Sequence, residues 1–600
     1  MSFTLCVLSR VVALCLLCLS TFALQATPPH EPWSAKSIEL AGGLAVQEGG
    51  RIKPLSTYAS FTLLRLSGKR STTTAEGRAQ GPVEWLLDTL YFPAEAAQAR
   101  VFLVNDSAAL EALGLKFPER RKRDRYTFHE LEPGFTKLFS LAHDWGAIDA
   151  KQRSSVQTEV VNLAERVDTF LRLNRQETLA LIPPDDDAVG EAGAVWLPPA
   201  VAFARLQGGE APSAARQRLF GSLDALAGAR KDSAAFELSL SELHATLQGF
   251  AAVRNVNGAL SLERNYYRWD LLGWSLGLFV LGFLGSAVTW LRPQGRWLYR
   301  ACCAVIGLAT LALVAAIVVR CLIRGRPPVS TLYESVLFVT AVGTIVALVF
   351  EWIDRQRIAC AAGSVLGLVG VFIANGYETL DAKDTMPSLV AVLDTNFWLA
   401  THVTAITIGY SAGLLAALLG SLYVLAKVLR PARTDSRTFA TLGRMVYGVL
   451  CFGLLFSIVG TILGGIWANE SWGRFWGWDP KENGALLIVI SQLLILHLRM
   501  GGFVREFGLA IAAAAAGCVV AFSWWGVNLL GVGLHSYGFT SGIQSALSTY
   551  YGVQGTIVVL GVVALWRERS AKRASLASLP AAGARPGSDL DPRAGRRKAA

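Results

Sequence analysis

Residues 445–500 read MVYGVLCFGLLFSIVGTILGGIWANESWGRFWGWDPKENGALLIVISQLLILHLRM. Two nearly uninterrupted apolar runs, 445–466 and 484–500, enclose WGRFWGWDPKE at 472–482, which holds three tryptophans and four charged residues. An α-helix rises about 1.5 Å per residue, so about 20 apolar residues cross the roughly 30 Å hydrocarbon core of a bilayer. The segment therefore predicts two membrane-spanning helices joined by an aromatic loop at one membrane surface.

Similar apolar runs repeat over the C-terminal half of the chain. Of the 600 residues, 52% are hydrophobic and 17% charged, which is less charge than a soluble protein of this length would carry. Helices satisfy their own backbone polar groups within a bilayer. The sequence thus predicts a polytopic α-helical membrane protein with about nine transmembrane helices after an N-terminal signal-like segment and a mainly helical soluble domain. The expected spans are 271–291, 298–319, 332–353, 358–376, 398–426, 445–466, 484–500, 508–530 and 546–566.

The first part of the chain differs in composition. Residues 1–26 combine one arginine, an apolar core and small residues near the end, as in a signal peptide or an uncleaved N-terminal anchor. Residues 27–268 read as a soluble domain, with apolar side chains at helical spacing over 156–170 and 236–250 and a loop at 184–200. The remainder divides into a transmembrane domain at 269–566, which includes the tryptophan loop at 467–484, and a tail at 567–600.

Basic residues predict the topology. They follow the first, third, fifth, seventh and ninth spans, and the positive-inside rule makes that side cytoplasmic. The soluble domain and the tryptophan loop are then extracytoplasmic, and we expect a multi-pass protein of the bacterial inner (cytoplasmic) membrane. One loop, with Arg320, Arg324 and Arg326, breaks the rule. Arg324 and Arg326 could contact haem propionates or face lipid headgroups.

The net charge of +11 does not indicate nucleic acid as a partner. The tail at 567–600 alone holds nine Lys and Arg against three acidic residues and is rich in small residues. Such a segment is expected to be disordered, in the cytoplasm beside anionic membrane lipid. None of the nine cysteines lies in the soluble domain, and no C-x-x-C-H motif is present. The chain is therefore neither disulfide-stapled there nor itself a c-type cytochrome.

Three of the seven histidines lie in the membrane half. His402 and His535 are expected at the same membrane face as the tryptophan loop. Haem requires axial nitrogen ligands and flat apolar surface, so these histidines and tryptophans form a candidate haem site. Arg474 or Lys481 could pair with the propionates. An interfacial aromatic belt with polar surface histidines is the simpler alternative.

His497 lies deeper, thirteen residues beyond Gly484, which is roughly 20 Å along a helix. An ionisable residue at that depth is a functional candidate. Snorkelling beside Arg499 is the alternative.

The tryptophan loop has features that a simple aromatic belt would not need. Glycines between tryptophans allow a tight turn, and Asp479 before Pro480 is expected to start the next helix. The candidate cofactor-binding residues of the loop are Trp472, Gly473, Trp476, Gly477, Trp478 and Asp479.

At this point the sequence resembles a known family. WGRFWGWDPKE resembles the WWD signature of haem-handling membrane proteins in cytochrome c biogenesis. The motifs RPPVSTLYESVLF at 326–338, DTMPSLVAVLDTNFWLATHV at 384–403 and WWGVNLLGVGLHSYGF at 524–539 resemble the CcsA (ResC) type of System II. The four motifs occur in the expected order, and the resemblance covers about 326–566.

The resemblance implies that His402 and His535 are external axial ligands of haem b, which is handled as a substrate. It implies an intramembrane haem site at His497. It further implies thioether attachment of haem to C-x-x-C-H motifs of apocytochrome c, with the chain as a component of a cytochrome c synthase (haem lyase) complex. A CcsB (ResB)-like membrane protein is the expected partner, because the domain at 27–268 stands where a fused partner would be.

Two other functions remain open. A haem transporter could hand haem to a separate haem chaperone, as CcmC-type WWD proteins do. A b-type cytochrome could carry electrons, although it would usually place paired histidines inside a helical bundle.

Overall fold

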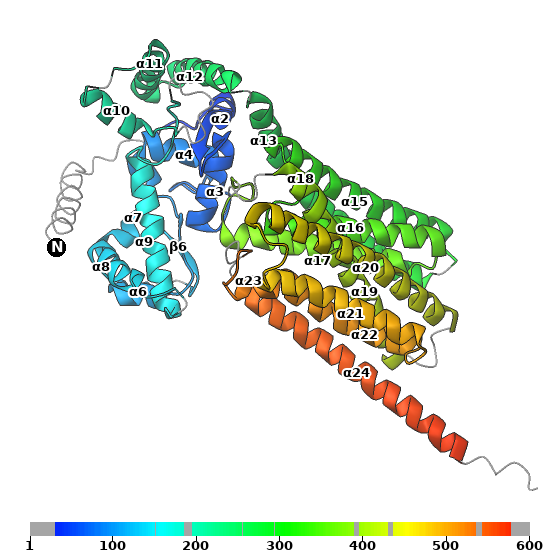
Figure 1. Cartoon of the computed structure of the whole chain (residues 1–600). Helices are drawn as coiled ribbons and strands as arrows, with labels where there is room; N and C mark the ends of the chain where they lie inside the picture. The colour runs from blue at the N-terminus through cyan, green and yellow to red at the C-terminus, as the bar shows by residue number, and fades with distance from the viewer. Residues whose placement is uncertain are drawn as a thin grey trace, which may run out of the picture. The chain divides into compact units, whose positions relative to one another are not determined.

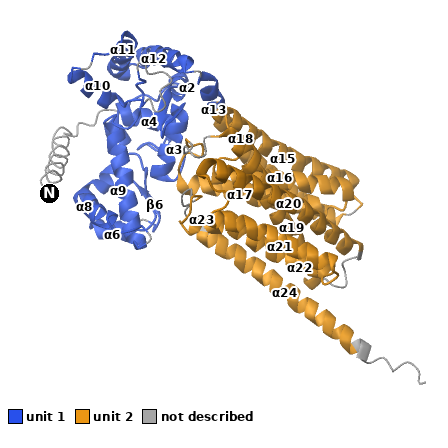
Figure 2. Ribbon diagram, viewed as in Figure 1, with its two compact units in different colours: residues 1–264 blue, residues 265–600 orange. Residues whose placement is uncertain are grey.

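The computed structural model describes ten segments of the chain: 30–119, 121–150, 152–184, 195–209, 211–254, 256–292, 294–388, 395–429, 436–535 and 543–577. The chain forms two compact units, Met1–Arg264 and Asn265–Ala600 (Figure 2). The expected signal peptide or anchor at 1–26 and the part of the tail at 578–600 lie outside the described residues.

The first unit is mainly helical around one hydrophobic core. The predicted helices at 156–170 and 236–250 are confirmed as α9 and α12, and their periodic apolar side chains are buried except for Val156, which is half-buried. Three two-stranded antiparallel sheets, β1–β2, β3–β4 and β5–β6, were not expected. The elements are α2 (Ala35–Gly42), β1 (Ala45–Glu48), β2 (Arg51–Pro54), α3 (Leu55–Ser67), β3 (Thr72–Thr73), β4 (Ala79–Gln80), α4 (Pro82–Tyr91), α5 (Pro93–Ala96), β5 (Phe102–Val104), α6 (Ala108–Leu113), β6 (Asp124–Tyr126), α7 (Phe128–Leu131), α8 (Phe135–Gly146), α9 (Ser155–Asn174), α10 (Pro199–Gln207), α11 (Ala214–Gly228) and α12 (Ser233–Val253). Helix α13 (Asn257–Trp269) contains the boundary between the units.

The second unit holds the membrane-spanning helices. Within the described residues, nine helices are long and apolar enough to cross a bilayer, so the fold predicted from the apolar runs is confirmed (Figure 1). Several helices extend beyond their apolar runs, and α24 continues into the predicted tail as far as Ala577. The helices are α14 (Leu271–Leu291), α15 (Arg296–Arg324), α16 (Leu332–Asp354), α17 (Ile358–Asp381), α18 (Asn396–Trp398), α19 (Thr404–Leu429), α20 (Ser436–Trp472), α21 (Pro480–Met500), α22 (Glu506–Ala521), α23 (Val527–Leu529) and α24 (Ile543–Ala577).

Two segments of this unit are π-helical. One, η5 (Leu399–Val403), precedes α19, and the other, η6 (Phe522–Gly526), follows α22. A π-helix adds a residue to the turn and re-aims its side chains and carbonyl groups, and such segments frequently occur at functional sites. Both elements border the same cavity, which is described below.

Close packing of α19 against α20 depends on small residues. A Cβ atom on Gly460 of α20 would lie 2.7 Å from the Cα and N atoms of Ile406 on α19. Helices in lipid lack a strong hydrophobic drive to associate, so such close backbone approach is a main source of packing energy.

We expect Gly460→Ala to lower the free energy of unfolding by about 1–3 kcal/mol, because the new methyl group forces two backbones apart. Thermal unfolding in detergent measures the change. Gly555→Ala on α24 is the matched control, since a Cβ atom there meets nothing within 4 Å. It should be neutral or stabilising by up to about 1 kcal/mol. Equal melting temperatures for the two variants would contradict the packing account.

In the first unit, His30 is held between two carboxylates. Its Nδ1 lies 2.8 Å from Glu95 Oε2, its Nε2 lies 3.2 Å from Asp88 Oδ1, and its ring stacks on Phe92. Burial by itself lowers the pKa of His30, but hydrogen bonding and charge from Asp88 and Glu95 outweigh burial and raise the pKa above its usual value.

This raised pKa predicts a pH-dependent contribution to stability. The imidazolium is favoured in the folded state, so its contribution is complete below the unfolded pKa and is lost as pH rises through the folded pKa. The melting-temperature difference between the wild type and His30→Gln should therefore be larger near pH 6 than near pH 8.5, values that bracket the ordinary histidine pKa. The exposed His143→Gln is the control. A difference that grows with rising pH would show that the two carboxylates do not stabilise the charged ring.

Candidate functional site

The tryptophan loop is shorter than its predicted range of 467–484. Helix α20 continues to Trp472 and α21 begins at Pro480, so the irregular segment covers 473–479. Gly473 ends α20 in a left-handed conformation (φ +69°). Asp479 caps α21 and Pro480 occupies its first turn, as the sequence predicted.

Two acidic side chains hold the loop in shape. Glu482 Oε2 accepts hydrogen bonds from the backbone N–H groups of Gly477 at 2.8 Å and Asp479 at 3.1 Å. Asp479 Oδ1 accepts from the Lys481 N–H at 2.9 Å. Together these bonds form a capping box, which pairs otherwise unsatisfied donors at the start of α21.

Asp479 also binds the segment that carries His535. Its Oδ2 accepts from the Leu534 N–H at 2.6 Å, and its Oδ1 lies 3.0 Å from His535 Nδ1. Gly533 permits this approach, because it adopts φ +93° and a Cβ atom there would lie 2.3 Å from Asp479 Oδ2. Burial tends to raise the pKa of Asp479, but these donors outweigh burial and hold the pKa below its usual range. The carboxylate is therefore ionised at neutral pH.

The ionised carboxylate selects a histidine tautomer. A carboxylate accepts only, so His535 Nδ1 donates, and in a neutral ring the lone pair lies on Nε2. The ring packs edge-on against Trp472, with centroids 5.6 Å apart. A histidine that donates its other nitrogen to a carboxylate is the usual arrangement of a metal-ligating imidazole.

His402 has the same chemistry with a different partner. It lies in the π-helix η5, and its Nδ1 is 2.8 Å from the Gly460 carbonyl oxygen. Because a carbonyl accepts only, Nδ1 donates and Nε2 keeps the lone pair. The ring lies against Trp467, with centroids 5.7 Å apart, and Gly464 provides room for it, since a Cβ atom there would be 2.6 Å from His402 Cε1.

Both histidines line one cavity of about 400 Å³. Trp472 and Trp476 also line it, and most of the remaining lining is apolar. Trp478 does not line the cavity: it is 69% exposed and adopts φ +57°. The structure thus brings His402, His535 and two of the three predicted tryptophans together around one space.

Of the two predicted cations, one lines the cavity. Lys481 Nζ donates to the Trp524 carbonyl oxygen at 2.6 Å and to Asn528 Oδ1 at 3.4 Å, on the cavity wall. Arg474 instead packs over the Trp472 ring, with its Nη1 3.8 Å from Glu482 Oε1.

His497 is separate from this cavity. It lies in the last turn of α21 with an exposed side chain, and its Nδ1 is 2.8 Å from the Leu493 carbonyl oxygen one turn earlier. The structure therefore does not join His497 to His402 and His535.

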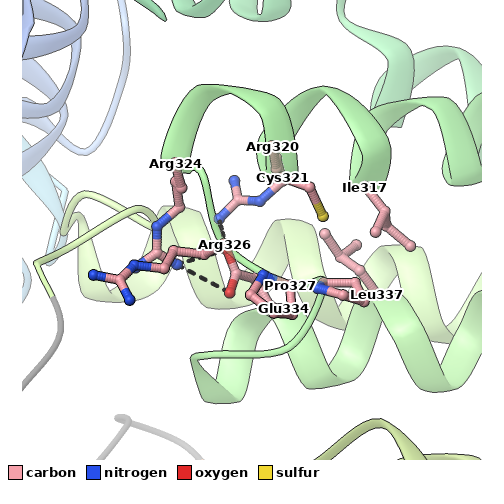
Figure 3. A pocket seen from close by; sticks show the side chains of 9 residues that line it. Ile317, Arg320, Cys321, Arg324, Arg326, Pro327, Glu334 and Leu337 are labelled. Carbon is pink, nitrogen blue, oxygen red and sulfur yellow. Dashed lines mark hydrogen bonds and ion pairs between the residues drawn. The ribbon is translucent and has the colours of Figure 1, made fainter. Parts of the chain in front are cut away.

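Two of the three arginines that break the positive-inside rule, Arg320 and Arg324, form a buried ion cluster with Glu334 (Figure 3). Arg326 instead donates to Asn396 Oδ1 at 3.4 Å. Arg320 Nη2 lies 3.1 Å and Arg324 Nη1 2.9 Å from Glu334 Oε1, and all three side chains are almost fully buried. The expectation that Arg324 contacts propionates or headgroups is wrong, because Arg324 also donates to Ser330 Oγ and to the Pro387 carbonyl oxygen. Ser330 lines the cavity, so the cluster braces one cavity wall.

We expect Glu334→Gln to lower the free energy of unfolding by about 3–5 kcal/mol, because it leaves two buried guanidinium groups without their counter-ion. Glu568→Gln is the matched control: it breaks an exposed pair in which Lys427 Nζ lies 3.8 Å away. That change should cost at most about 1 kcal/mol. Chemical or thermal unfolding in detergent compares the two. If both variants lost a similar free energy of unfolding, the ion cluster would not stabilise this part of the cavity wall.

Some site residues were not anticipated. Trp467 is the first residue of the predicted tryptophan loop at 467–484 but was not singled out, and the structure places it in α20 beside His402. Gly460 contributes a backbone carbonyl, which no sequence pattern reveals. Trp524 acts through its carbonyl group within a π-helix, and the sequence pattern predicts ordinary helix there.

Comparisons with known proteins bear on the same region. Residues 329–535 match the family model described as cytochrome C assembly protein. The chain is 34% identical over 241 residues to cytochrome c biogenesis protein CcsA of Chlamydomonas reinhardtii, covering 39% of this chain and 67% of that protein. It is 33% identical over 263 residues to CcsA of Synechococcus sp. (strain CC9902), covering 39% of this chain and 86% of that protein.

A third relative is similar over more of the chain. Protein NrfI of Wolinella succinogenes is 28% identical over 531 residues, which cover 85% of this chain and 55% of NrfI. The chain therefore spans about half the length of NrfI, and this similarity extends well beyond the residues that match CcsA.

Proposed function

The chain belongs to the CcsA family of cytochrome c biogenesis proteins, and from this premise we propose that it binds haem b between His402 and His535. The bound haem is the substrate, presented beside the tryptophan loop for attachment to apocytochrome c. The observation that carries this proposal is that the two histidines share the same hydrogen-bonding arrangement. Each Nδ1 is held by an acceptor, and both rings line the same cavity.

The cavity has the character of a porphyrin site. Its volume of about 400 Å³ lies within the range of about 300–1,000 Å³ that is usual for small-molecule sites. Trp472 and Trp476 offer flat apolar surface, and two imidazoles suit the two axial positions of haem iron.

The reaction needs positioning rather than new functional groups. Each thiol of a C-x-x-C-H client adds across one haem vinyl group, so sulfur bonds to one carbon and the thiol hydrogen goes to the other. No electrons are gained or lost in the sum. By holding the ring still, the protein brings vinyl groups and thiols together, which converts a bimolecular encounter into an oriented reaction. The histidine of the client then replaces one axial ligand.

The remaining assignments extend this proposal. The tryptophan loop and residues 27–268 face the outside of a bacterial inner membrane, and the basic tail faces the cytoplasm. His497, with its exposed side chain on α21, belongs to an intramembrane haem site that a CcsB (ResB)-like partner completes. The partner is consistent with the position of His497, because a single exposed histidine supplies one axial ligand.

The absorption spectrum of the purified chain tests the proposal. We expect haem to co-purify with a low-spin spectrum that is lost in the double variant His402→Ala, His535→Ala. Asp479→Asn should keep the site and weaken haem binding about 10- to 100-fold, because it removes the partner that orients His535. The exposed His129→Ala is the matched control. A low-spin spectrum that persists in the double variant would contradict the assignment of His402 and His535 as axial ligands.

A further inference from the structure

Lys481 is a half-buried cation in the wall of the cavity. It lies in the first turn of α21, and among the described residues its ammonium donates to two neutral acceptors, the Trp524 carbonyl and the Asn528 amide oxygen. An ammonium has three N–H groups, so two acceptors leave one donor for another partner.

The acidic side chains next to Lys481 in the sequence bind other groups. Asp479 binds His535 and the Leu534 N–H, and Glu482 binds two N–H groups of the tryptophan loop. Within the described residues, no carboxylate oxygen lies within 4 Å of Lys481 Nζ. A charge that is partly removed from water and has no counter-ion close by favours a ligand of opposite charge.

The surroundings of Lys481 distinguish it from the other cations near the site. Arg474 has Glu482 nearby and covers the Trp472 ring, and Arg324 is neutralised by Glu334. The carbonyl that holds Lys481 belongs to the π-helix η6, so a local departure from α-helix accompanies the placement of this ammonium.

We propose that Lys481 binds a haem propionate and so determines which edge of the porphyrin enters the cavity. This inference rests on the proposed function. In protoporphyrin IX the two propionates lie on the edge opposite the two vinyl groups. A propionate bound at Lys481 therefore leaves the vinyl edge accessible to the client thiols. Lys481 is a positioning residue rather than a catalytic one.

The test uses haem b and its dimethyl ester, in which both propionates are methylated and no carboxylate remains. Soret titration of the purified full chain gives the ratio of ester Kd to haem Kd for each variant. A hydrogen bond to a charged group is worth about 1.5–3 kcal/mol, so the wild-type ratio should exceed the Lys481→Met ratio by about 10- to 100-fold. Comparing ratios cancels the different partitioning of the two porphyrins into detergent.

Two further variants serve as controls. Lys481→Arg should keep most of the preference, since it retains the charge, and its melting temperature reports that the fold is intact. Arg474→Met should keep the wild-type ratio. The proposal is overturned if Lys481→Met keeps the wild-type ratio or if Arg474→Met loses it. If the wild type binds neither porphyrin, the proposed function fails as well; if it binds both with a histidine-dependent low-spin spectrum and Lys481→Met changes nothing, only the role of Lys481 fails.

Discussion

The Asp479 carboxylate joins two segments that are far apart in the chain, the start of α21 and residues 534–535. It caps α21, receives the Leu534 N–H, and contacts His535 Nδ1. One side chain thus sets the start of a membrane helix, the path of the segment after α23 and the orientation of a candidate ligand. Its low pKa follows from these donors, so the charge that orients His535 persists at neutral pH.

The part of the cavity wall that holds His402 depends on a different constraint, which is close helix packing in lipid. Gly460 allows α20 to approach α19, and the same residue offers its carbonyl oxygen to His402. The position of His402 is therefore coupled to helix packing, whereas the position of His535 is coupled to a carboxylate. The Glu334 ion cluster adds a third support, because it holds the wall that includes Ser330.

The apolar runs predicted the nine spans because a bilayer requires long apolar helices, and few other structures satisfy that requirement. The start of α21 was predictable for a local reason, since Asp479 before Pro480 is a helix-start signal. The two-stranded sheets of the first unit were not predicted: β5 and β6 are separated in the chain by α6, whereas β1–β2 is a local hairpin whose Gly49-Gly50 turn is a signal in the sequence. The two π-helices were not predicted, because the sequence pattern there is that of ordinary helix. The same holds for Arg324: its sequence position suggested an exposed cation, and only the fold reveals Glu334 beside it. Trp478 shows the reverse case, in which a residue of the motif points away from the cavity.

The central claim is that the cavity holds haem between His402 and His535. An electron-microscopy map of the chain purified with haem in lipid nanodiscs tests this most directly. The account predicts porphyrin density in the cavity, with both imidazoles on the iron and the rings of Trp472 and Trp476 against the macrocycle. Density for haem only beside His497, or a cavity filled by lipid with His402 and His535 turned away from any iron, would contradict it.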